Sequence, residues 1–490
     1  MTRTERLRDA VRRRASVWTL LLVAATLAGA ALRVWILASR LGTLDSDEAI
    51  VGLMARHALD GEFSVFYWLS LYGGSQEALG AAAVFAVFGS SVVALKVVPI
   101  VLFGAAAVMT WLIGRRTVGE PAARIGAVLL LVWPPFSVWW TTKERGFYAM
   151  GLLCGLTVLW LALRLRERDS RLDAAVLGFA LGFGVWATQQ SLLLALPALL
   201  WLALRRPATY RLAPVAVAGF VVGALPWLAW NARHGWSAVF PSAVAGQNSS
   251  YGQRFVDLFT TVLPTWLGLR LPYSLDWVFG RAVGIALLAL ALAGLGIALV
   301  RRPRGLEPLL FTGALFPFFY AASSYTYYVT EPRYLVFLAP PATLLLARLL
   351  TRPAAAALAL TAAIAFSVYG LLRIDDQGRF LPRAARDVRV PPDMGPLIGF
   401  LERRGANRVL ADYWIAYRLS FESRERIVAT STRFVRYVPH DRLVRRSAYP
   451  SRVFVEGQVK ERRARADLLR RGYRRYRVGG FVAYVHPRNG

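Results

Sequence analysis

The sequence predicts a mainly α-helical, multi-pass membrane protein of about eleven transmembrane helices, with a small α/β domain at its C-terminus. Its 490 residues are 56% hydrophobic with a mean hydropathy of +0.43, which exceeds the usual composition of soluble chains. Apolar runs of about 20 residues, the length of a membrane-spanning helix, recur up to residue 372. Beyond that point short helical and strand-like segments alternate. We therefore expect a transmembrane domain over residues 1–372 and a soluble α/β domain over residues 373–490.

The first apolar run, from about Ser16 to Leu37, follows a basic N-terminus. It continues past the small residues 28–30, which could mark a signal-peptide cleavage site, so we expect a retained signal anchor. The basic N-terminus then lies in the cytoplasm. Ten further spans are predicted at residues 92–113, 122–140, 146–163, 173–189, 190–204, 212–230, 280–300, 308–323, 334–350 and 354–372.

Arginine clusters indicate which loops face the cytoplasm. The apolar stretch 78–88 is too short to span, and counting it as a span would move every cluster to the outer face. We expect it to form a helix at the membrane interface. The C-terminal domain then lies outside the membrane, and the Arg/Ala-rich composition favours a bacterial cytoplasmic (inner) membrane. The clusters are Arg115–Arg116, Arg164–Arg171, Arg205–Arg211, Arg301–Arg304 and Arg348–Arg352.

The net charge of +30 would suggest a nucleic-acid partner in a soluble protein. About half of it is the arginine that cytoplasmic loops normally carry, so we expect no nucleic-acid partner. The segment from residue 373 has 27 basic and 12 acidic residues, a net charge of +15. Helices are predicted there at 396–404 and 459–471, strands at 408–414, 425–430 and 453–456, and a hairpin at 476–485.

Cysteine and histidine usage argues against a metal site built from these residues. Cys154 is the only cysteine and lies inside an apolar run, which excludes an intrachain disulfide. The four histidines, His57, His234, His440 and His486, are far apart, and none shows the spacing of metal ligands.

Three carboxylates stand within four residues where the first span leaves the membrane. Asp45, Asp47 and Glu48 precede a segment whose apolar residues repeat at helical spacing. Asp45 and Glu48 have the spacing of a capping box, and acids suit a helix N-terminus. Alternatively, crowded carboxylates raise each other's pKa, as is common where one must act as a base. The second interpretation is favoured for all three acids, most strongly for Asp47 and Glu48.

The same loop continues with a Gly73-Gly74 turn signal, followed by Ser75 and Glu77. Ser75 can cap the interfacial helix, and Glu77 falls in its first turn. Glu77 is either a surface acid that suits the helix dipole or a member of a functional site.

Other outer loops carry charged or aromatic residues. Lys143, Glu144 and Arg145 stand between two predicted spans. They form either a solvated turn with an ion pair or a site where the cations bind a phosphate and Glu144 orients a substrate. Arg333 either extends to lipid headgroups or binds a phosphate. The aromatic-rich loop 231–278 is interpreted as a lid over a lipid substrate in preference to an interfacial anchor.

Together these residues resemble the GT-C membrane glycosyltransferases. The resemblance is to bacterial members of the protein-mannosyltransferase and aminoarabinose-transferase group (glycosyltransferase family 39), and it covers essentially the whole chain. The segment 411–419 is similar to the outer domain of those proteins. The motifs that carry it are Asp47-Glu48, the Tyr-Gly-Gly-Ser-x-Glu stretch ending at Glu77, Glu144-x-x-x-Tyr148 with Arg145, and Arg333-Tyr334.

The resemblance implies transfer of a hexosyl or pentosyl sugar from a polyprenyl-phosphate-linked donor to a lipid, glycan or protein acceptor at the outer face. Asp47 would deprotonate the acceptor hydroxyl with inversion at the sugar carbon, Glu48 would tune it, and Glu144 would be the second acid. The resemblance implies no certain cofactor, and the acidic loop could hold a divalent cation. The substrate-binding residues would be Asp45, Glu77, Lys143, Arg145, Tyr148, Arg333 and Tyr334, of which Lys143, Arg145 and Arg333 would hold the lipid phosphate.

Two other function classes remain open. A transporter or flippase for a lipid-linked or anionic substrate would be expected to show internal repeats and charges in mid-membrane. No repeat is evident, and ionisable residues gather at span ends, with Lys96 the main exception. A non-catalytic scaffold could instead use the basic C-terminal domain to bind anionic glycans or lipid headgroups.

Overall fold

The computed structural model describes residues 3–239, 249–301, 305–324, 327–350 and 352–489. The chain divides into two compact units. The helical unit comprises residues 1–36, 100–142 and 148–377, and the mixed unit comprises residues 37–99, 143–147 and 378–490. Arg302 and Arg304 of one predicted cytoplasmic cluster, and residues 240–248 of the aromatic loop, lie outside the described residues.

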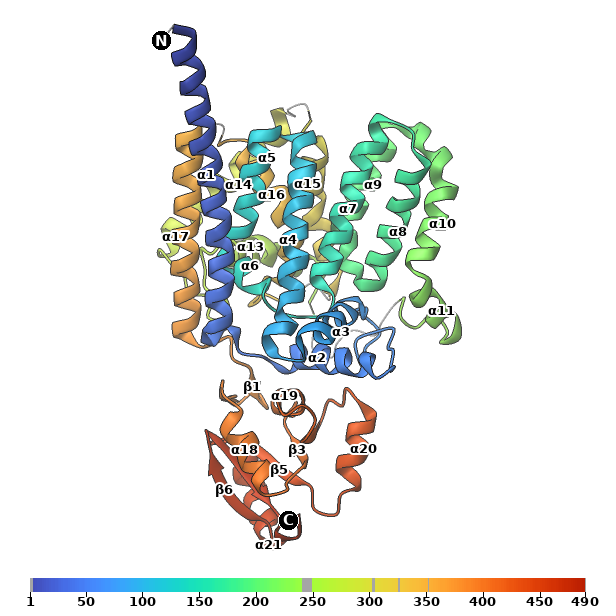
Figure 1. The fold of residues 1–490 in the computed structure, drawn as a ribbon, viewed down its shortest axis with the longest axis vertical. Coiled ribbons are helices and arrows are strands. Elements are labelled where there is room, and N and C mark those ends of the chain that lie inside the picture. Colours follow the sequence, from blue (N-terminus) through green and yellow to red (C-terminus); the bar gives the residue numbers. More distant parts are fainter. Residues whose placement is uncertain (1–2, 240–248, 302–304, 325–326, 351, 490) are drawn as a thin grey trace. The chain divides into compact units, whose positions relative to one another are not determined.

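Helices occupy every predicted span (Figure 1). Two predicted spans are each divided into two α-helices, one near Pro134 and one near Ala224, and the span predicted at 334–350 begins with a 3-10 helix, Arg333–Phe337, before α16. The helices are α1 (Arg3–Ala38), α4 (Val92–Thr117), α5 (Glu120–Val132), α6 (Pro135–Trp140), α7 (Tyr148–Glu167), α8 (Arg171–Ala187), α9 (Leu192–Arg205), α10 (Ala213–Gly223), α11 (Leu225–Arg233), α14 (Arg281–Arg301), α15 (Glu307–Ala322), α16 (Ala339–Ala347) and α17 (Pro353–Gln377).

The helix lengths bear on the predicted number of spans. Among the described residues, four helical segments are long and apolar enough to cross a membrane, namely Trp18–Ala38, Val92–Thr117, Tyr148–Glu167 and Pro353–Gln377. The segments Gln189–Arg205 and Pro207–Gly223, which meet at a bend of 119°, add a fifth if they are counted as one span. The multi-pass character is confirmed, and the number eleven stays a prediction.

Helices α8 and α10 pack so closely that their backbones touch. A Cβ atom on Gly178 would lie 1.8 Å from the carbonyl oxygen of Ala216, and one on Gly219 would lie 2.1 Å from that of Ala175. Small residues allow this approach in membrane helices, where van der Waals contact drives association. Any larger side chain at Gly178 or Gly219 would separate the two helices.

The mixed unit begins with two helices from the first predicted outer loop. They are α2 (Ser46–Leu59) and α3 (Gln76–Phe88), which pack against each other. A helix was predicted over residues 78–88, and α3 confirms it. Its place at the membrane interface stays a prediction.

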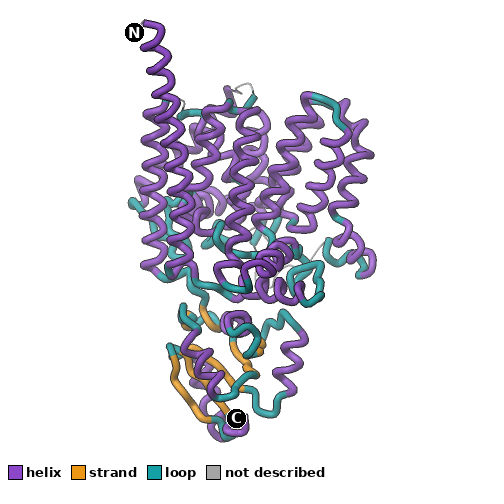
Figure 2. The backbone as a smooth tube through the Cα atoms, viewed as in Figure 1, coloured by secondary structure: helices purple, strands orange, loops and turns teal. Residues whose placement is uncertain are grey.

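The C-terminal part of the mixed unit is an α/β fold around a five-stranded sheet of order β4-β3-β5-β7-β6 (Figure 2). Strand β3 pairs in parallel with β4 and β5, and β7 pairs antiparallel with β5 and β6. The strands are β3 (Arg408–Ala411), β4 (Val428–Ser431), β5 (Ser451–Val455), β6 (Arg474–Val478) and β7 (Phe481–Val485), besides a short pair, β1 (Arg383–Ala384) and β2 (Val388–Arg389). The helices are α18 (Gly395–Arg403), α19 (Tyr413–Glu422), α20 (Val438–Arg446) and α21 (Val459–Arg470).

The predicted α/β character and the hairpin at Gly479-Gly480 are confirmed, but the boundaries of the strands predicted at 408–414 and 425–430 were wrong. The strand predicted at 408–414 ends at Ala411, because Asp412 caps α19 and accepts a hydrogen bond from the Trp414 amide at 3.1 Å. An aspartate followed by apolar residues is a helix-start signal, and it was overlooked here.

Helix α19 packs directly on α2 inside the mixed unit. Gly52 leaves room for the Phe421 ring, whose nearest atom would lie 2.3 Å from a Cβ at that position. The Arg56 guanidinium stacks over the same ring at 4.1 Å and donates to the Phe421 carbonyl oxygen at 2.8 Å. Ser46 donates to the Tyr413 carbonyl oxygen at 2.6 Å. The acidic start of α2 therefore lies beside the start of α19.

Candidate functional site

The first turn of α2 is closed by a capping box. One carboxylate oxygen of Asp45 accepts from the Asp47 amide at 3.0 Å and from the Glu48 amide at 3.1 Å. The Glu48 carboxylate accepts in return from the Asp45 amide at 3.3 Å. The capping interpretation of Asp45 and Glu48 is confirmed, and it orients the side chains of the first turn.

Glu48 lies at the centre of a buried ion-pair network. Its side chain is 0% exposed and pairs with Lys96 and, at 2.9 Å, with the Nζ atom of Lys143. The backbone amide of Glu144 donates to it at 3.0 Å. Lys143 also reaches the Asp45 carboxylate at 3.4 Å and the Thr43 carbonyl oxygen at 3.1 Å. Lys96, whose charge stood out in the sequence, is thus balanced by Glu48.

Asp47 is the most accessible carboxylate of this turn. Its side chain is 32% exposed, compared with 8% for Asp45 and 0% for Glu48. One Asp47 oxygen accepts from the Tyr413 hydroxyl at 2.6 Å, and the other accepts from Arg145 at 2.7 Å. Arg145 also pairs with Asp45 at 2.8 Å.

These six side chains form the acid–cation cluster, which consists of Asp45, Asp47, Glu48, Lys96, Lys143 and Arg145. Three negative charges face three positive ones, so the cluster is electrically balanced. A balanced, hydrogen-bonded group holds its members in place more firmly than isolated charges in water. The arrangement presents one accessible carboxylate with fixed orientation, which is what a general base requires.

The electrostatics of Asp45 and Glu48 differ from the sequence prediction. Burial alone would raise the pKa of the Asp45 carboxyl, but the charges of Arg145 and Lys143 outweigh it and lower that pKa below its ordinary value. The pKa of Glu48 is likewise lowered, because Lys143 and Lys96 outweigh its burial. The idea that crowding raises the pKa was wrong for these two acids, since each has a cation beside it.

Glu144 and Glu77 form a second acidic pair in the same unit. Both are buried, with Glu144 0% and Glu77 1% exposed. One Glu144 oxygen accepts from the Gly146 amide at 2.8 Å. Burial, followed by the charge of Glu77, raises the pKa of Glu144 well above its ordinary value of 4.5. Neither the solvated-turn interpretation of Glu144 nor the surface-acid interpretation of Glu77 holds. Ser75 begins α3 without a side-chain cap.

We expect Glu144→Gln to flatten the dependence of stability on pH. The folded-state pKa of Glu144 is raised, so between pH 4.5 and that value the native chain binds more protons than the unfolded chain. Stability then falls by as much as ~1.4 kcal/mol per pH unit as the pH rises. Melting temperatures of the detergent-purified chain from pH 5 to 8 should decline less in the variant. The exposed Glu167→Gln serves as control, and equal slopes in Glu144→Gln and the wild type would contradict the expectation.

Sequence reasoning missed three aromatic and basic residues beside Asp47. The Tyr67 hydroxyl donates to the Asp47 carbonyl oxygen at 3.3 Å, and Tyr413 donates to the carboxylate. Burial, and then the charge of Asp47, raises the pKa of Tyr413 well above 10.0. The Arg436 guanidinium lies over the Tyr67 ring at 5.3 Å and the Tyr413 ring at 6.0 Å. The similarity of segment 411–419 to an outer domain was the one available signal.

Arg333 and its neighbours belong to the helical unit. Its guanidinium stacks over the Tyr328 ring at 3.9 Å and the Trp140 ring at 5.0 Å, and it pairs with Glu331. The Nε atom of Arg333 is buried and has no hydrogen-bond partner among the described residues. In the same unit the hydroxyls of Tyr148 and Tyr334 lie 3.2 Å apart.

The predicted site residues therefore fall into two groups. The mixed unit brings together seven of them: Asp45, Asp47, Glu48, Glu77, Lys143, Glu144 and Arg145. The helical unit holds the remaining three, Tyr148, Arg333 and Tyr334. A divalent cation at the acidic loop stays a prediction, and it would have to share the carboxylates with the ammonium and guanidinium groups that now bind them.

The described part of the aromatic loop contributes to the core. Its helical pieces are α12 (Tyr251–Asp257), a π-helical turn (Leu258–Val262) and α13 (Leu263–Trp266). Trp266 is 1% exposed and its indole donates to Ser137 at 2.9 Å. This end of the loop is packed in place, and a lid over a lipid stays a prediction.

The comparisons with known proteins agree with this architecture. Residues 78–230 match the family described as dolichyl-phosphate-mannose-protein mannosyltransferase. No curated protein matches the sequence.

Two solved structures of ArnT from Cupriavidus metallidurans have the same fold. The one bound to undecaprenyl phosphate has a TM-score of 0.65 at 14% identity, over 96% of this chain and 98% of ArnT. The apo structure has a TM-score of 0.66 at 13% identity, over 97% and 99%. The archaeal oligosaccharyltransferase AglB from Archaeoglobus fulgidus, in complex with an inhibitory peptide and a dolichol-phosphate, has a TM-score of 0.50 at 12% identity, over 96% and 74%. The chain therefore has the fold of the GT-C membrane glycosyltransferases, as the sequence resemblance predicted.

Proposed function

We propose that this protein transfers a sugar from a polyprenyl-phosphate-linked donor to an acceptor at the outer face of a bacterial cytoplasmic membrane. The matched family is named for a dolichyl-phosphate-linked mannose donor. Similar structures contain undecaprenyl phosphate or a dolichol-phosphate. We propose a hexose or pentose as the transferred sugar and a lipid, glycan or protein as the acceptor.

The observation that carries the proposal is the Asp47 carboxylate, which is accessible while both of its oxygens are held by Tyr413 and Arg145. Asp47 accepts the proton of an acceptor hydroxyl as that oxygen bonds to the anomeric carbon. The bond from that carbon to the phosphate oxygen breaks, and the polyprenyl phosphate leaves with the electron pair. Attack opposite the leaving group inverts the configuration at the sugar carbon.

The remaining cluster members position Asp47 in this proposal. Lys143 and Lys96 balance Glu48, and Arg145 orients Asp47. Their charges are directed at carboxylates, so Lys143 and Arg145 fit a positioning role better than the phosphate-binding role predicted from sequence. Burial and the charge of Glu77 raise the pKa of Glu144, and one of its oxygens accepts from the Gly146 amide. Glu144 fits a structural hydrogen-bonding role better than that of an ionised second acid.

Arg333 is the proposed ligand of the donor phosphate. Its free Nε donor and its stacking between Tyr328 and Trp140 fix the plane of the guanidinium. A planar cation is well suited to a phosphate whose charge grows as the sugar departs.

Arg333→Lys is expected to lower kcat/KM for the donor by roughly 10- to 100-fold, because a charged hydrogen bond contributes about 1.5–3 kcal/mol. Initial rates against donor concentration measure this effect. Arg270→Lys, which alters another arginine stacked on an aromatic ring in the same unit, is the matched control. Unchanged donor kinetics in Arg333→Lys would exclude the phosphate role.

The overall activity is tested with the full chain in proteoliposomes and polyprenyl phosphates that carry a labelled hexose or pentose. A membrane extract supplies acceptors. Release of free polyprenyl phosphate together with label on an acceptor is the expected result. Movement of intact donor across the bilayer without cleavage would favour a flippase and overturn the proposal. The proposal would also be overturned if the protein, shown to be folded, cleaved none of the labelled donors.

A further inference from the structure

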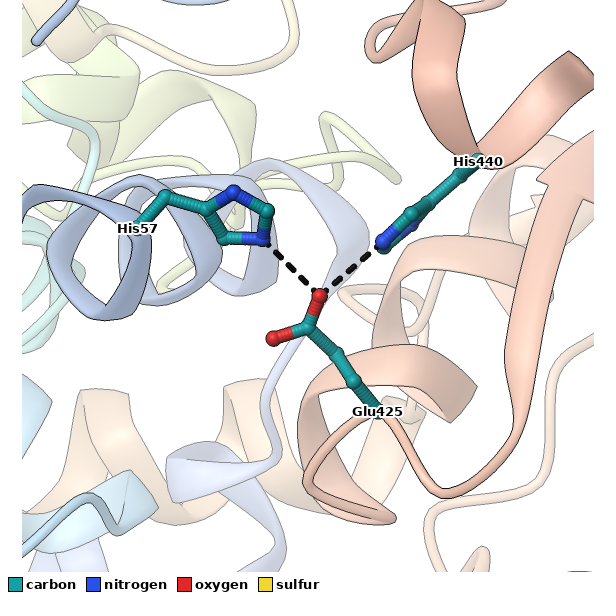
Figure 3. Close-up of side chains that lie close together, drawn as sticks. All are labelled: His57, Glu425 and His440. Atoms are coloured by element: carbon teal, nitrogen blue, oxygen red, sulfur yellow. Dashed lines mark hydrogen bonds and ion pairs between the residues drawn. The ribbon is translucent and has the colours of Figure 1, made fainter. Parts of the chain in front are cut away.

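Two histidines and a glutamate from distant parts of the sequence converge in the mixed unit. Figure 3 shows the rings of His57 and His440 pointing at the Glu425 carboxylate. The Nε2 atoms of His57 and His440 each lie 2.9 Å from the same Glu425 oxygen. The histidines show no metal-ligand spacing in the sequence, but the fold brings His57 of α2 and His440 of α20 to the same Glu425 oxygen.

We propose that His57, Glu425 and His440 bind one divalent metal ion of the zinc class. Their ligand atoms all lie within 4.8 Å of one another. Two imidazole nitrogens and one carboxylate are a common zinc ligand set, with bonds of about 2.0–2.2 Å. Atoms bound at that distance around a tetrahedral ion are separated by ~3.4 Å, so small side-chain rotations bring this group to the required geometry.

The second ring nitrogen of a metal-binding histidine usually pairs with a carboxylate or a carbonyl oxygen, and His57 has such a partner. The Nδ1 atom of His57 pairs with the Glu62 carboxylate at 2.9 Å, and the Tyr437 hydroxyl donates to that same carboxylate at 2.6 Å. A carboxylate on the second nitrogen fixes the ring orientation and makes the ligating nitrogen more basic. Glu62 and Glu425 together match the charge of a divalent cation.

Aromatic rings hold both imidazoles in place. Trp68 meets the His57 ring edge-on at 5.1 Å, and Tyr437 lies 4.8 Å from His57 and 4.9 Å from His440. Trp68 and Tyr437 stack on each other at 4.1 Å. Because the rings are packed on several sides, binding an ion requires little ordering of the ligands.

The backbone at Glu425 adopts a left-handed conformation that is rare for residues other than glycine. Arg424 and Glu425 both have positive φ, +54° and +59°. Consecutive non-glycine residues in this region are strained, and strain of this kind persists where surrounding structure enforces it, often at functional sites. The strand predicted from residue 425 begins at Val428 for this reason. The turn directs the Glu425 carboxylate toward the two histidines.

Exposure differs among the three ligands. The His57 and His440 side chains are 14% and 6% exposed, and that of Glu425 is 23% exposed. Three protein ligands leave the fourth position of a tetrahedral ion for a water molecule. Water would reach that position past Glu425, the most exposed of the three ligands. The ion would connect the C-terminal end of α2 to the C-terminal α/β segment. This proposal does not depend on the proposed transferase activity.

The test is metal binding by the full detergent-purified chain after chelator treatment and dialysis. We expect one equivalent of Zn²⁺ by elemental analysis. Bound Co²⁺ should give the visible absorption bands of a four-coordinate site with nitrogen and oxygen ligands. His440→Gln should weaken Zn²⁺ binding at least 100-fold in chelator competition. His486→Gln, which alters a histidine stacked on Tyr449 in the same unit, should bind as the wild type does.

Glu62→Gln keeps the test decisive if the ligand variants fail to fold. This side chain is 59% exposed, and its loss should weaken Zn²⁺ affinity roughly 10- to 100-fold. The proposal is overturned if the wild-type chain takes up less than half an equivalent of Zn²⁺. It is also overturned if folded His440→Gln, or failing that Glu62→Gln, retains wild-type Zn²⁺ affinity.

Discussion

Replacing Asp47 with asparagine is expected to lower the rate of sugar transfer by roughly 10²- to 10⁴-fold, the usual contribution of a general base. The amide oxygen can still accept from the Tyr413 hydroxyl, which now donates at 2.6 Å, so the local structure should be retained. The amide cannot take a proton from the acceptor. Turnover of labelled donor by the full chain in proteoliposomes measures the change in kcat.

Two variants make this result interpretable. Asp60→Asn changes an exposed aspartate at the other end of α2 and should leave kcat unchanged. Tyr413→Phe removes a hydrogen bond to Asp47 but keeps the carboxylate, and it should lower kcat by less than Asp47→Asn does. Full turnover by Asp47→Asn at normal expression would remove Asp47 from the role of base.

Glu48→Gln is expected to destabilise the protein by about 3–5 kcal/mol, because removing one partner of a buried ion pair leaves the other charge uncompensated. Here Lys96, whose side chain is 1% exposed, loses its partner, and Lys143 loses its 2.9 Å bond. Melting temperature and the half-life of the detergent-purified chain report this loss.

A double-mutant cycle separates the energy of the Lys96–Glu48 ion pair from the packing effects of each single substitution. Lys96→Met alone should also be destabilising, and Lys96→Met combined with Glu48→Gln should cost less than the sum of the two. The exposed pair of Glu120 and Arg124 gives the comparison, and its disruption by Glu120→Gln should cost less than ~1 kcal/mol. Additive effects at Lys96 and Glu48 would show that their pairing contributes nothing.

Hydropathy located the helices well, since each apolar run became one helix or two. It did not locate breaks such as the one between α5 and α6, where Pro134 and Pro135 interrupt the helix. Residues 408–414 were read as one strand because the apolar residues 409–411 are followed, after Asp412, by a second apolar stretch. The aspartate between them is a local signal, but its effect depends on a cap that only the folded chain forms.

The site was harder to predict than the fold because its partners are far apart in sequence. The capping box of Asp45 and Glu48 was visible, since it needs only a spacing of three residues. The pairing of Glu48 with Lys143 was not visible, because 95 residues separate them. Lys143 was therefore assigned to a substrate phosphate, because the sequence does not show that Glu48 lies beside it.

The packing of α19 on α2 has a consequence for how this chain can be shortened or exchanged with others. Gly52 and Ser46 contact Phe421 and Tyr413, which lie more than 350 residues later in the chain. A protein ending at residue 377 would lack the Phe421 ring that covers Gly52 and the tyrosine that holds Asp47. The C-terminal segment is thus not a detachable module, and a chimera that swaps it must carry α2 along with it.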